Sequence, residues 1–358
     1  MIVVIGGGVA GLASGLALAT RRIDVCVIDR HGRPGQESST HNSGVIHAGL
    51  YHPPDSLKTR LCHAGRARLY SFCRQHGVPH VRCGKLVVAA HGEEAELEAV
   101  AQSAAANGVT LEHVDAHALK AREPNVAAAE ALWSADTGWI DADAYVRTLV
   151  AELQRHGGVF LNGTPVVGIE VRPDGTIDVV TSRERIRAEA VINAAGLDAD
   201  AVSQMAGGDA FRIYPCRGEY AELAPASRHL VRGLVYPVPH HSGHGLGVHL
   251  TKTIGGAVWI GPTIRYQEDK DDYERGRLPL QAFLEPTRKL LPDIILGDLR
   301  LGGSGIRAKL HPATERFADF LIRRDSRIGA LVHVAGIDSP GLTASLAIGE
   351  YVAEVLGV

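Results

Sequence analysis

The sequence predicts an α/β protein in which a discontinuous Rossmann-like domain is interleaved with a second, α+β domain built on an antiparallel sheet. Two observations lead to this fold class. Apolar strands followed by small-residue helices occur at the beginning, in the middle and at the end of the chain. Between them, residues 211–264 hold extended segments joined by Gly and Pro turns. We expect the first domain to comprise residues 1–82, 144–210 and 301–358, and the second to comprise residues 83–143 and 211–300.

The first eleven residues carry the strongest motif. The apolar run 1–5 is long enough for one buried strand, Gly6-Gly7-Gly8-Val9-Ala10-Gly11 follows without a spacer, and residues 12–19 are typical of a small-residue helix. This order of strand, G-x-G-x-x-G and helix is the fingerprint of a dinucleotide-binding unit. Gly6 permits the tight turn, Gly8 lets the backbone approach a pyrophosphate, and Gly11 lets the helix pack closely on the strand. The segment predicts a bound adenine dinucleotide, with a glycine-rich structural turn as the alternative.

Two further strand ends are expected at the nucleotide site. Residues 23–28 form the second strand, which ends at Asp29, 18 positions after Gly11. An acidic side chain at this position can accept hydrogen bonds from a ribose hydroxyl. The apolar strand 190–196 ends in the small residues Ala195 and Gly196, where a backbone can approach a cofactor closely.

Local signals place the remaining elements. Ser56 can cap a helix over residues 57–76 that Gly77 ends, and Asp141 or Asp143 can cap a helix over residues 144–156. Further helices are expected at residues 93–107, after Asp115, after Asp198, before about Leu291 and at residues 341–356. Strands are expected at residues 81–90, 133–140, 159–161, 166–171, 214–223, 230–237, 245–253 and 257–264, with hairpins around Asp174 and at residues 320–335.

Composition excludes some functions. The net charge of −3 gives no global basic field that would attract nucleic acid. The five cysteines show no C-x-x-C spacing and are odd in number, which favours reduced thiols in a cytoplasm. The first strand begins at Met1, so no leader peptide is expected, and no apolar run reaches transmembrane length. The sequence predicts a cytoplasmic protein and leaves a peripheral association with the inner face of the membrane open.

Three histidines, His240, His241 and His244, resemble a metal cluster at first sight. They lie in a Gly/Ser/Pro turn without the carboxylate or thiolate neighbours that a metal site usually has. We therefore interpret the turn as a solvated loop and expect no metal site.

Motifs spread over nearly the whole chain resemble those of a known family. They are His41-Asn42-Ser43-Gly44-Val45-Ile46-His47-Ala48-Gly49, Ser56-Leu57-Lys58, Cys216-Arg217-Gly218-Glu219-Tyr220, Tyr236-Pro237-Val238-Pro239, Gly247-Val248-His249-Leu250-Thr251 and Ser339-Pro340-Gly341-Leu342-Thr343. The chain resembles FAD-dependent oxidoreductases of the D-amino-acid oxidase and glycerol-3-phosphate dehydrogenase superfamily, and within it the L-2-hydroxyglutarate dehydrogenases (oxidases). The stretch between about Ile264 and Gly302 is shorter than in the longer members, so we do not expect the additional helical or membrane-docking element that those members carry.

The resemblance implies FAD as the cofactor, with the flavin between the two domains. It places Gly6, Gly8, Gly11 and Asp29 at the adenosine end, Ser43 and Gly44 near the pyrophosphate and flavin, the backbone of Val167 at the adenine, Ala195 and Gly196 across the cofactor, and Gly341, Leu342 and Thr343 at the N1–O2 edge of the flavin. Reduction puts negative charge on this edge, and the amides at the start of a helix would stabilise it.

Oxidation of a 2-hydroxy acid through a flavin requires a base for the hydroxyl proton and cations for the carboxylates, while a hydride passes to flavin N5. His47 is the first candidate for the base. Two alternative roles remain for His47: a covalent bond to the flavin, or a purely structural hydrogen bond to the backbone. His249, on a strand that alternates apolar and polar residues, is the rival base or a carboxylate donor.

The preferred carboxylate clamps are Arg217 and Arg307, because each lies in a glycine-containing segment and a guanidinium can pair with a carboxylate through two hydrogen bonds. Tyr220 is a weaker substrate-binding candidate. Tyr236 and Lys58 are candidates for the distal carboxylate of a two-carboxylate substrate.

The leading hypothesis is FAD-dependent oxidation of L-2-hydroxyglutarate to 2-oxoglutarate, with a quinone, a carrier protein or oxygen as electron acceptor. The alternatives are a glycine, sarcosine or D-amino-acid oxidase and a glycerol-3-phosphate dehydrogenase. More remote alternatives are a non-catalytic flavin sensor and an RNA-modifying flavoprotein.

Overall fold

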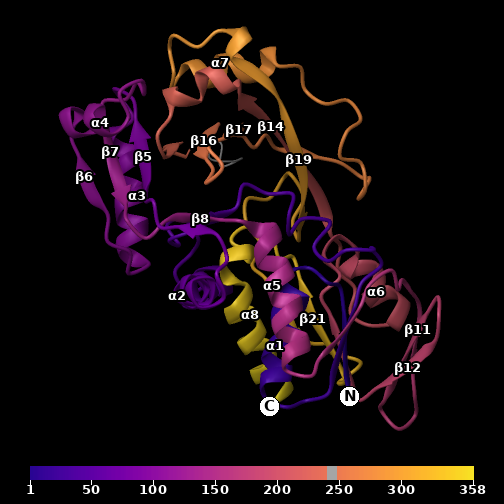
Figure 1. Cartoon of the computed structure of the whole chain (residues 1–358). Coiled ribbons are helices and arrows are strands. Elements are labelled where there is room, and N and C mark those ends of the chain that lie inside the picture. The colour runs from indigo at the N-terminus through magenta and orange to yellow at the C-terminus, as the bar shows by residue number, and fades with distance from the viewer. Residues whose placement is uncertain (240–247) are drawn as a thin grey trace.

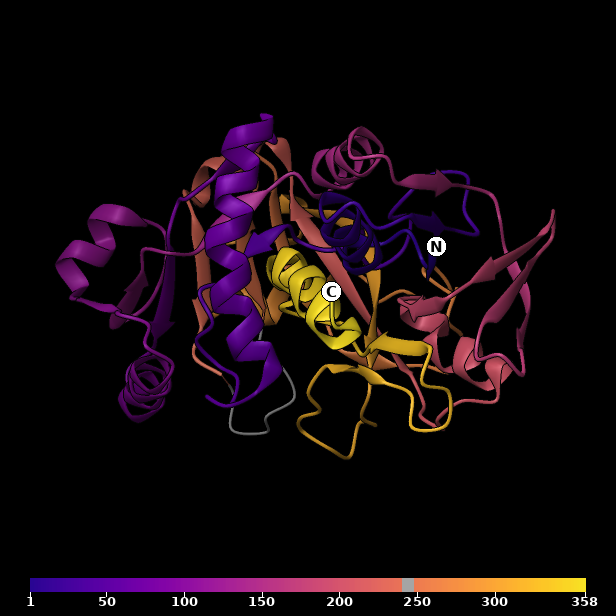
Figure 2. The same cartoon turned by 90° about the horizontal axis from the view of Figure 1, so that it is seen from below.

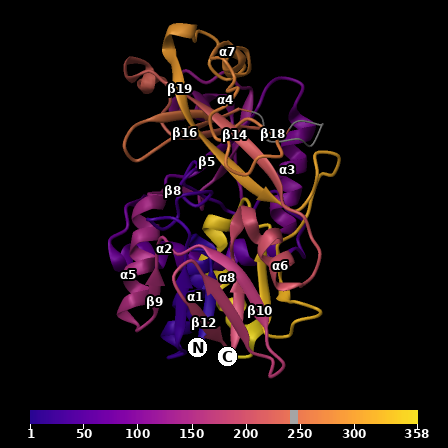
Figure 3. The same cartoon turned by 90° about the vertical axis from the view of Figure 1, so that its right-hand side faces the viewer.

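The computed structural model describes residues 1–239 and 248–358, so His240, His241, His244 and the first residues of the strand expected at 245–253 lie outside the described residues. Two units stack on one another, with the chain's N- and C-termini close together at the far end of one of them (Figure 1). In the side view, the unit that contains α1 and α8 lies below the unit that contains β14 and β19 (Figure 3). The predicted fold class, a Rossmann-like domain combined with an antiparallel-sheet domain, is confirmed.

The lower unit is built on a six-stranded sheet. Its strand order is β20 (Leu321–Arg324), β21 (Leu331–Ala335), β13 (Ala190–Asn193), β1 (Ile2–Ile5), β2 (Val25–Ile28) and β9 (Val159–Leu161). All neighbouring strands are parallel except β20, which is antiparallel to β21. Because the apolar strands are buried on both faces, they read as continuous hydrophobic runs in the sequence. Strands from the start, middle and end of the chain thus share one sheet.

Helices cover one face of this sheet. They are α1 (Val9–Thr20), α2 (Leu57–His76), α5 (Ala142–Arg155) and α8 (Gly341–Leu356). Figure 2 shows α8 lying between α1 and α2. Glycines permit this close packing: a Cβ at Gly349 would overlap the carbonyl oxygen of Ala13, and one at Gly65 would overlap that of Thr343.

The opposite face carries α6 (Ala199–Ala206) and a small sheet of β10 (Val166–Val171), β11 (Ile177–Thr181) and β12 (Arg185–Ala188). Apolar side chains of this small sheet, such as Ile169 and Val179, pack against Val3 and Ile5 of β1.

The upper unit is built on a nine-stranded sheet. The strand order is β18 (Arg265–Tyr266), β14 (Tyr214–Leu223), β17 (Val258–Gly261), β16 (His249–Lys252), β15 (Leu234–Pro237), β5 (Lys85–Ala89), β7 (Glu130–Ser134) and β6 (Glu112–Val114), and β19 (Leu299–Lys309) also pairs with β14. The strand pairs are antiparallel except for β15 with β5. The helices of this unit are α3 (Glu94–Ala106), α4 (Ala116–Arg122) and α7 (Gln281–Arg288).

A third small sheet of β3 (Val45–Ile46), β8 (Gly138–Ile140) and β4 (His80–Val81) lies where the units meet. The single strand predicted over residues 81–90 is divided in the structure: β4 ends at Val81 and β5 begins at Lys85. Between them Gly84 takes a positive φ of 70°, which interrupts the extended backbone. The domain ranges stay a prediction, and residues 301–309 lie beside β14 in the nine-stranded sheet.

Helix ends follow the expected caps. The Ser56 hydroxyl accepts a hydrogen bond from the Thr59 amide at 3.2 Å, and Gly77 ends α2 in the left-handed conformation. Of the two aspartates proposed for α5, Asp141 is the cap, and its carboxylate accepts from the Ala144 amide at 3.0 Å. Among the described residues, no helix combines the length and apolar character needed to cross a membrane.

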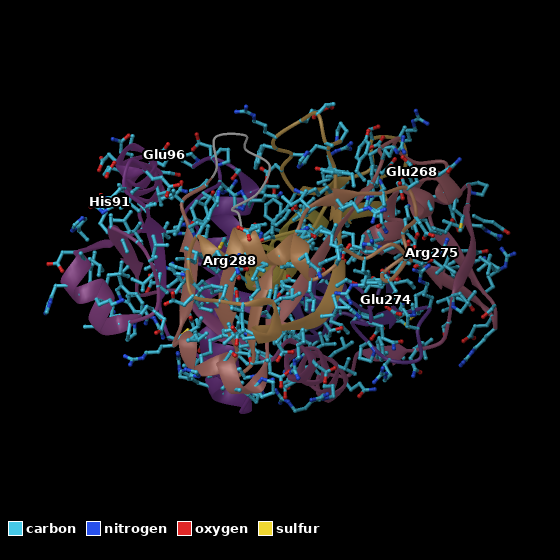
Figure 4. All side chains as sticks on the ribbon, turned by 90° about the horizontal axis from the view of Figure 1, so that it is seen from above. His91, Glu96, Glu268, Glu274, Arg275 and Arg288 are labelled. Carbon is cyan, nitrogen blue, oxygen red and sulfur yellow. The ribbon has the colours of Figure 1, made fainter. Side chains whose placement is uncertain are left out.

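The outer face above α7 carries charged side chains of both signs. Figure 4 shows His91 and Glu96 at one side, Arg288 of α7 in the middle, and Glu268, Glu274 and Arg275 at the other side. The labelled side chains do not gather into a region of one sign.

Candidate active site

A cavity of about 330 Å³ lies at the carboxyl ends of β1, β2 and β13. Its walls bring together several residues predicted to bind the cofactor, namely Gly6, Gly8, Asp29, Ala195 and Gly196. Val166 also lines it, whereas the side chain of the predicted Val167 is 59% exposed. A nucleotide site in this position matches the crevice at the strand ends of open α/β sheets.

The glycine turn leaves no room for side chains at two positions. Gly6 has a φ of +113°, and a Cβ there would overlap the carbonyl oxygen of Ala194. A Cβ at Gly11 would overlap the carbonyl oxygen of Gly6. Helix α1 begins directly after this turn, its N-cap residue Gly8 offers no side-chain cap, and its first turn holds no acidic residue. Its amino end is therefore suited to an anionic group such as a pyrophosphate.

Asp29 holds the turn in place. One carboxylate oxygen accepts a hydrogen bond from the Gly7 amide at 2.6 Å, and the other accepts from the His31 amide at 2.7 Å. Burial raises the pKa of Asp29, although these amide hydrogen bonds oppose the shift. A carboxylate has about four acceptor positions, so Asp29 retains capacity for a ribose hydroxyl.

Residues that sequence reasoning did not single out complete this cavity. Ser39 accepts from the Val9 amide at 3.0 Å, and Arg30 pairs with Glu37 at 2.5 Å and with Asp198 at 2.8 Å across its rim. These charged and polar groups come from loops, where the sequence offered no periodic signal.

The segment after residue 37 carries the chain from this cavity toward the nine-stranded sheet. The Ser38 hydroxyl donates to the carbonyl oxygen of Ile306 on β19 at 2.6 Å. Ser43 lies near the Tyr220 phenol on β14, where it opposes the rise that burial causes in the pKa of that phenol, and Gly44 turns the chain with a φ of +66°. The segment therefore joins the two units beside the predicted flavin position.

His47 lies at the start of α8. Its amide donates to the Thr343 hydroxyl at 3.0 Å, and its Nε2 lies 3.3 Å from the Ser339 hydroxyl. Burial, together with the charges of Lys85 and His52, lowers the pKa of His47 to about 3. The imidazole is consequently neutral at pH 7, the protonation state that a general base starts from.

The first turn of α8 follows directly. It contains the predicted flavin-facing residues Gly341, Leu342 and Thr343, with no side-chain cap and no acidic residue. Such a helix start can stabilise a developing negative charge.

A row of polar side chains crosses the face of the nine-stranded sheet. The rings of Tyr236 and His249 stack at 3.5 Å with an interplanar angle of 11°. The Lys85 ammonium lies 4.6 Å from the centre of the Tyr236 ring. Tyr220 follows on β14, where the nearby Arg307 charge opposes the rise that burial causes in the pKa of its phenol. The structure thus brings His249, Tyr236, Tyr220 and Arg307 onto one surface, as a substrate site requires.

Arg217 and Arg307, predicted as equivalent clamps, differ in their surroundings. Arg217 is 0% exposed, and its guanidinium donates to Glu219 at 2.9 and 3.1 Å and to backbone carbonyls of residues 272 and 275. Arg307 is partly exposed and lies within 3.4 Å of the Thr263 carbonyl, and no carboxylate of the described residues lies within ion-pair distance of it. Arg307 is therefore the guanidinium that can bind a substrate carboxylate.

Lys58, predicted for the distal carboxylate, lies in a buried ion pair. Its ammonium is 2.6 Å from Asp338, which also binds Lys309 at 3.2 Å. Burial favours a raised pKa of Asp338, but the charges of Lys58 and Lys309 outweigh it and lower that pKa. The pair fastens α2 to the loop before α8.

We expect Lys58→Met to destabilise the protein because it removes a partner of the buried Asp338 carboxylate. Removing one partner of a buried ion pair lowers the free energy of unfolding by about 3–5 kcal/mol. Because Asp338 keeps its contact with Lys309, we expect a loss at the lower end of this range. Urea unfolding of Lys58→Met beside Lys289→Met, which changes an exposed lysine, measures the loss. Equal unfolding midpoints for the two variants would contradict the structural role.

The comparisons with known proteins agree with this geometry. The profile of the family described as FAD dependent oxidoreductase matches residues 1–355. Human mitochondrial L-2-hydroxyglutarate dehydrogenase is 32% identical over 407 residues, covering 99% of this chain and 88% of the relative. L-2-hydroxyglutarate dehydrogenase of Escherichia coli K12 is 29% identical over 388 residues, covering 98% of this chain and 91% of the relative. The FAD-bound L-alpha-glycerophosphate oxidase structure from Mycoplasma pneumoniae superimposes with a TM-score of 0.91 at 25% identity, covering 100% of this chain and 94% of that one.

The chain therefore belongs to the family of FAD-dependent oxidoreductases and is an enzyme that uses FAD. The residues present fit this cofactor, since a glycine turn, the amino end of a helix and a carboxylate surround one cavity at the carboxyl ends of the parallel strands.

Proposed function

We propose that the enzyme oxidises L-2-hydroxyglutarate to 2-oxoglutarate. The observation that carries this proposal is a guanidinium, that of Arg307, which has no carboxylate partner among the described residues and lies on a sheet face lined with polar side chains. His47 lies against the start of α8, and Arg307 lies on the sheet face that carries Tyr220, Tyr236 and His249. The names of the curated relatives support the choice of substrate.

In this proposal the Arg307 guanidinium binds the carboxylate next to the reacting carbon, with Tyr220 beside it. Oxidation removes a hydride from that carbon and a proton from its hydroxyl. Bound FAD supplies the hydride acceptor at its N5 position. His47 accepts the hydroxyl proton at its imidazole nitrogen, which is unprotonated at pH 7. In this proposal Tyr236 and the stacked His249, on the same sheet face as Arg307, keep water from the substrate.

A titration of the FAD-loaded protein under anaerobic conditions tests the substrate. L-2-hydroxyglutarate is expected to bleach the visible flavin band, whereas D-2-hydroxyglutarate, glycine and glycerol-3-phosphate leave it unchanged. Bleaching by glycine would instead favour an amine oxidase, and bleaching by glycerol-3-phosphate a phosphate-ester substrate. If none of the four compounds reduces the flavin, the proposed function is contradicted and a flavin sensor is favoured.

Regeneration of the oxidised enzyme requires an electron acceptor, which we propose to be a quinone, a carrier protein or oxygen. Turnover with a soluble quinone analogue, compared with oxygen consumption under air, separates these classes. A cytoplasmic enzyme that associates peripherally with the inner face of the membrane would suit a quinone.

We expect Arg307→Met to raise the KM for L-2-hydroxyglutarate by about one to two orders of magnitude, because a charge-assisted hydrogen-bonded pair contributes roughly 1.5–3 kcal/mol. Arg300→Met is the matched control, since Arg300 lies on the same strand, is exposed and, among the described residues, forms an ion pair only with half-buried Glu222 at 2.7 Å. Steady-state kinetics of the two variants make the comparison. An unchanged KM in Arg307→Met would exclude Arg307 as the clamp.

A further inference from the structure

Lys85, at the first position of β5, is a buried cation that the proposed reaction does not use. The residue is 1% exposed, and its ammonium lies between two aromatic rings, 5.0 Å from the centre of Tyr51 and 4.6 Å from that of Tyr236. Within residues 1–239 and 248–358, no carboxylate oxygen lies within ion-pair distance of this ammonium. A lysine in such a position is rare, because charged groups are seldom fully buried without a partner.

The two rings compensate only part of the cost of burial. Cation–π contacts contribute roughly 2 kcal/mol each when they are desolvated. Burial nevertheless lowers the pKa of Lys85 to about 7, which shows that the charged form lacks a strong partner. An anion that entered this place would supply that partner.

The position of the ammonium points to the substrate. Lys85 lines a cavity of about 20 Å³ together with His47, Tyr51 and Pro340, the residue directly before α8. A cavity of this size holds about one water molecule or one carboxylate oxygen. The proposed base and the helix start that faces the flavin therefore share this small cavity with the ammonium.

Sheet register places Lys85 and Arg307 on opposite sides of the same row. Tyr236 on β15 lies beside β5 and contacts Lys85, and it stacks on His249 of β16. Arg307 lies beyond β17 and β14, on β19. A substrate whose carboxylate next to the reacting carbon binds Arg307 would direct its far end toward β5.

We propose that the Lys85 ammonium binds the distal carboxylate of the substrate and so selects dicarboxylic over monocarboxylic 2-hydroxy acids. This inference rests on the proposed function, because it assigns the second carboxylate of the same substrate. It replaces Lys58, which is held by Asp338, in the role of the distal cation.

Kinetics with matched substrates test the assignment. L-2-hydroxyglutarate and L-2-hydroxypentanoate have the same chain length, and only the first has a distal carboxylate. We expect Lys85→Met to raise the apparent Kd for flavin reduction by L-2-hydroxyglutarate about ten- to hundredfold, the range of a charge-assisted pair. The value for L-2-hydroxypentanoate is expected to stay within about threefold of wild type, and Lys289→Met is expected to leave both values unchanged. Equal losses for both substrates, or no loss for either, would overturn the proposal.

Stability separates binding from a structural role. Removal of a buried charge that has no carboxylate partner is expected to leave the Tm unchanged or to raise it, with FAD content retained. A lower Tm together with FAD loss would assign Lys85 to the fold and would overturn the proposal.

Glutarate, a dicarboxylate that cannot be oxidised at a hydroxyl, keeps the test independent of turnover. Its binding is followed by the shift of the flavin absorption band, with butyrate as the monocarboxylate control. Wild type is expected to bind glutarate more tightly than butyrate, and Lys85→Met is expected to lose this difference. If L-2-hydroxyglutarate fails to reduce wild type while glutarate binding still depends on Lys85, the substrate proposal fails and the carboxylate site stands. If glutarate binding is equal in wild type and variant, the site itself is refuted.

Discussion

Replacing His47 by alanine is expected to slow flavin reduction by L-2-hydroxyglutarate by about 10²–10⁴-fold, the usual contribution of a general base. The substitution keeps the backbone amide that donates to Thr343, so the junction with α8 stays intact. FAD content and Tm should therefore match wild type. Anaerobic stopped-flow reduction measures the rate, and His91→Ala, at an exposed histidine, is the matched control.

The pH dependence follows from the direction of the pKa shift. The pKa of His47 is lowered to about 3, so the unprotonated form that serves as base is present at all pH values above about 4. The kcat/KM of wild type should consequently show no acid limb due to this group between pH 5 and pH 8. Reduction of His47→Ala at nearly the wild-type rate would remove His47 as base and leave His249 or an amine substrate. Flavin that stays attached to the denatured wild-type protein would instead indicate a covalent bond.

Replacing Gly11 by alanine is expected to abolish tight FAD binding. The added Cβ would overlap the backbone carbonyl oxygen of Gly6, and a backbone atom in a constrained turn cannot move aside as a flexible side chain can. The strain spreads to the Gly6 turn that forms the cavity wall, with a loss of stability of about 3 kcal/mol, the upper range of overpacking effects. FAD absorbance after gel filtration and urea unfolding measure both effects.

Gly303→Ala is the control for this substitution, because a Cβ at Gly303 meets no atom within 4 Å and its φ is not in the left-handed region. The two variants add the same methyl group at positions of different crowding. A Gly11→Ala protein with full FAD content would show that the turn tolerates a wider spacing between β1 and α1 than the structure has.

Local signals made the Rossmann-like part of the fold predictable from sequence. The glycine fingerprint, the acidic residue after β2 and the caps Ser56 and Asp141 each depend on residues near one another in the chain, and each lies where it was expected. The site residues depended on distant partners and were harder to predict. Arg217 and Arg307 have similar sequence surroundings, yet Glu219 and the backbone carbonyls of residues 272 and 275 hold only the first.

Lys85 escaped prediction for a related reason. Its segment, Lys85-Leu86-Val87-Val88-Ala89, reads as an apolar strand with a charged residue at its edge, where solvent exposure is the usual outcome. The rings of Tyr51 and Tyr236 that enclose the ammonium come from a preceding loop and from a strand much later in the chain. A local signal was the continuous apolar run over residues 86–89, which is typical of a strand buried on both faces.

The strand order of the six-stranded sheet has a consequence for synthesis of the protein. Helix α1 packs on α8, which is translated about 320 residues later, and β13 pairs with β21, which is translated about 140 residues later. A nascent chain on the ribosome therefore exposes the α8-facing apolar surface of α1 until about 320 further residues have emerged. Contacts between segments so far apart also slow folding. The residues that line the nucleotide cavity all lie between Ile5 and Met205, whereas the predicted flavin-facing start of α8 is translated about 135 residues later, so the two parts of the proposed cofactor site form at different stages of synthesis.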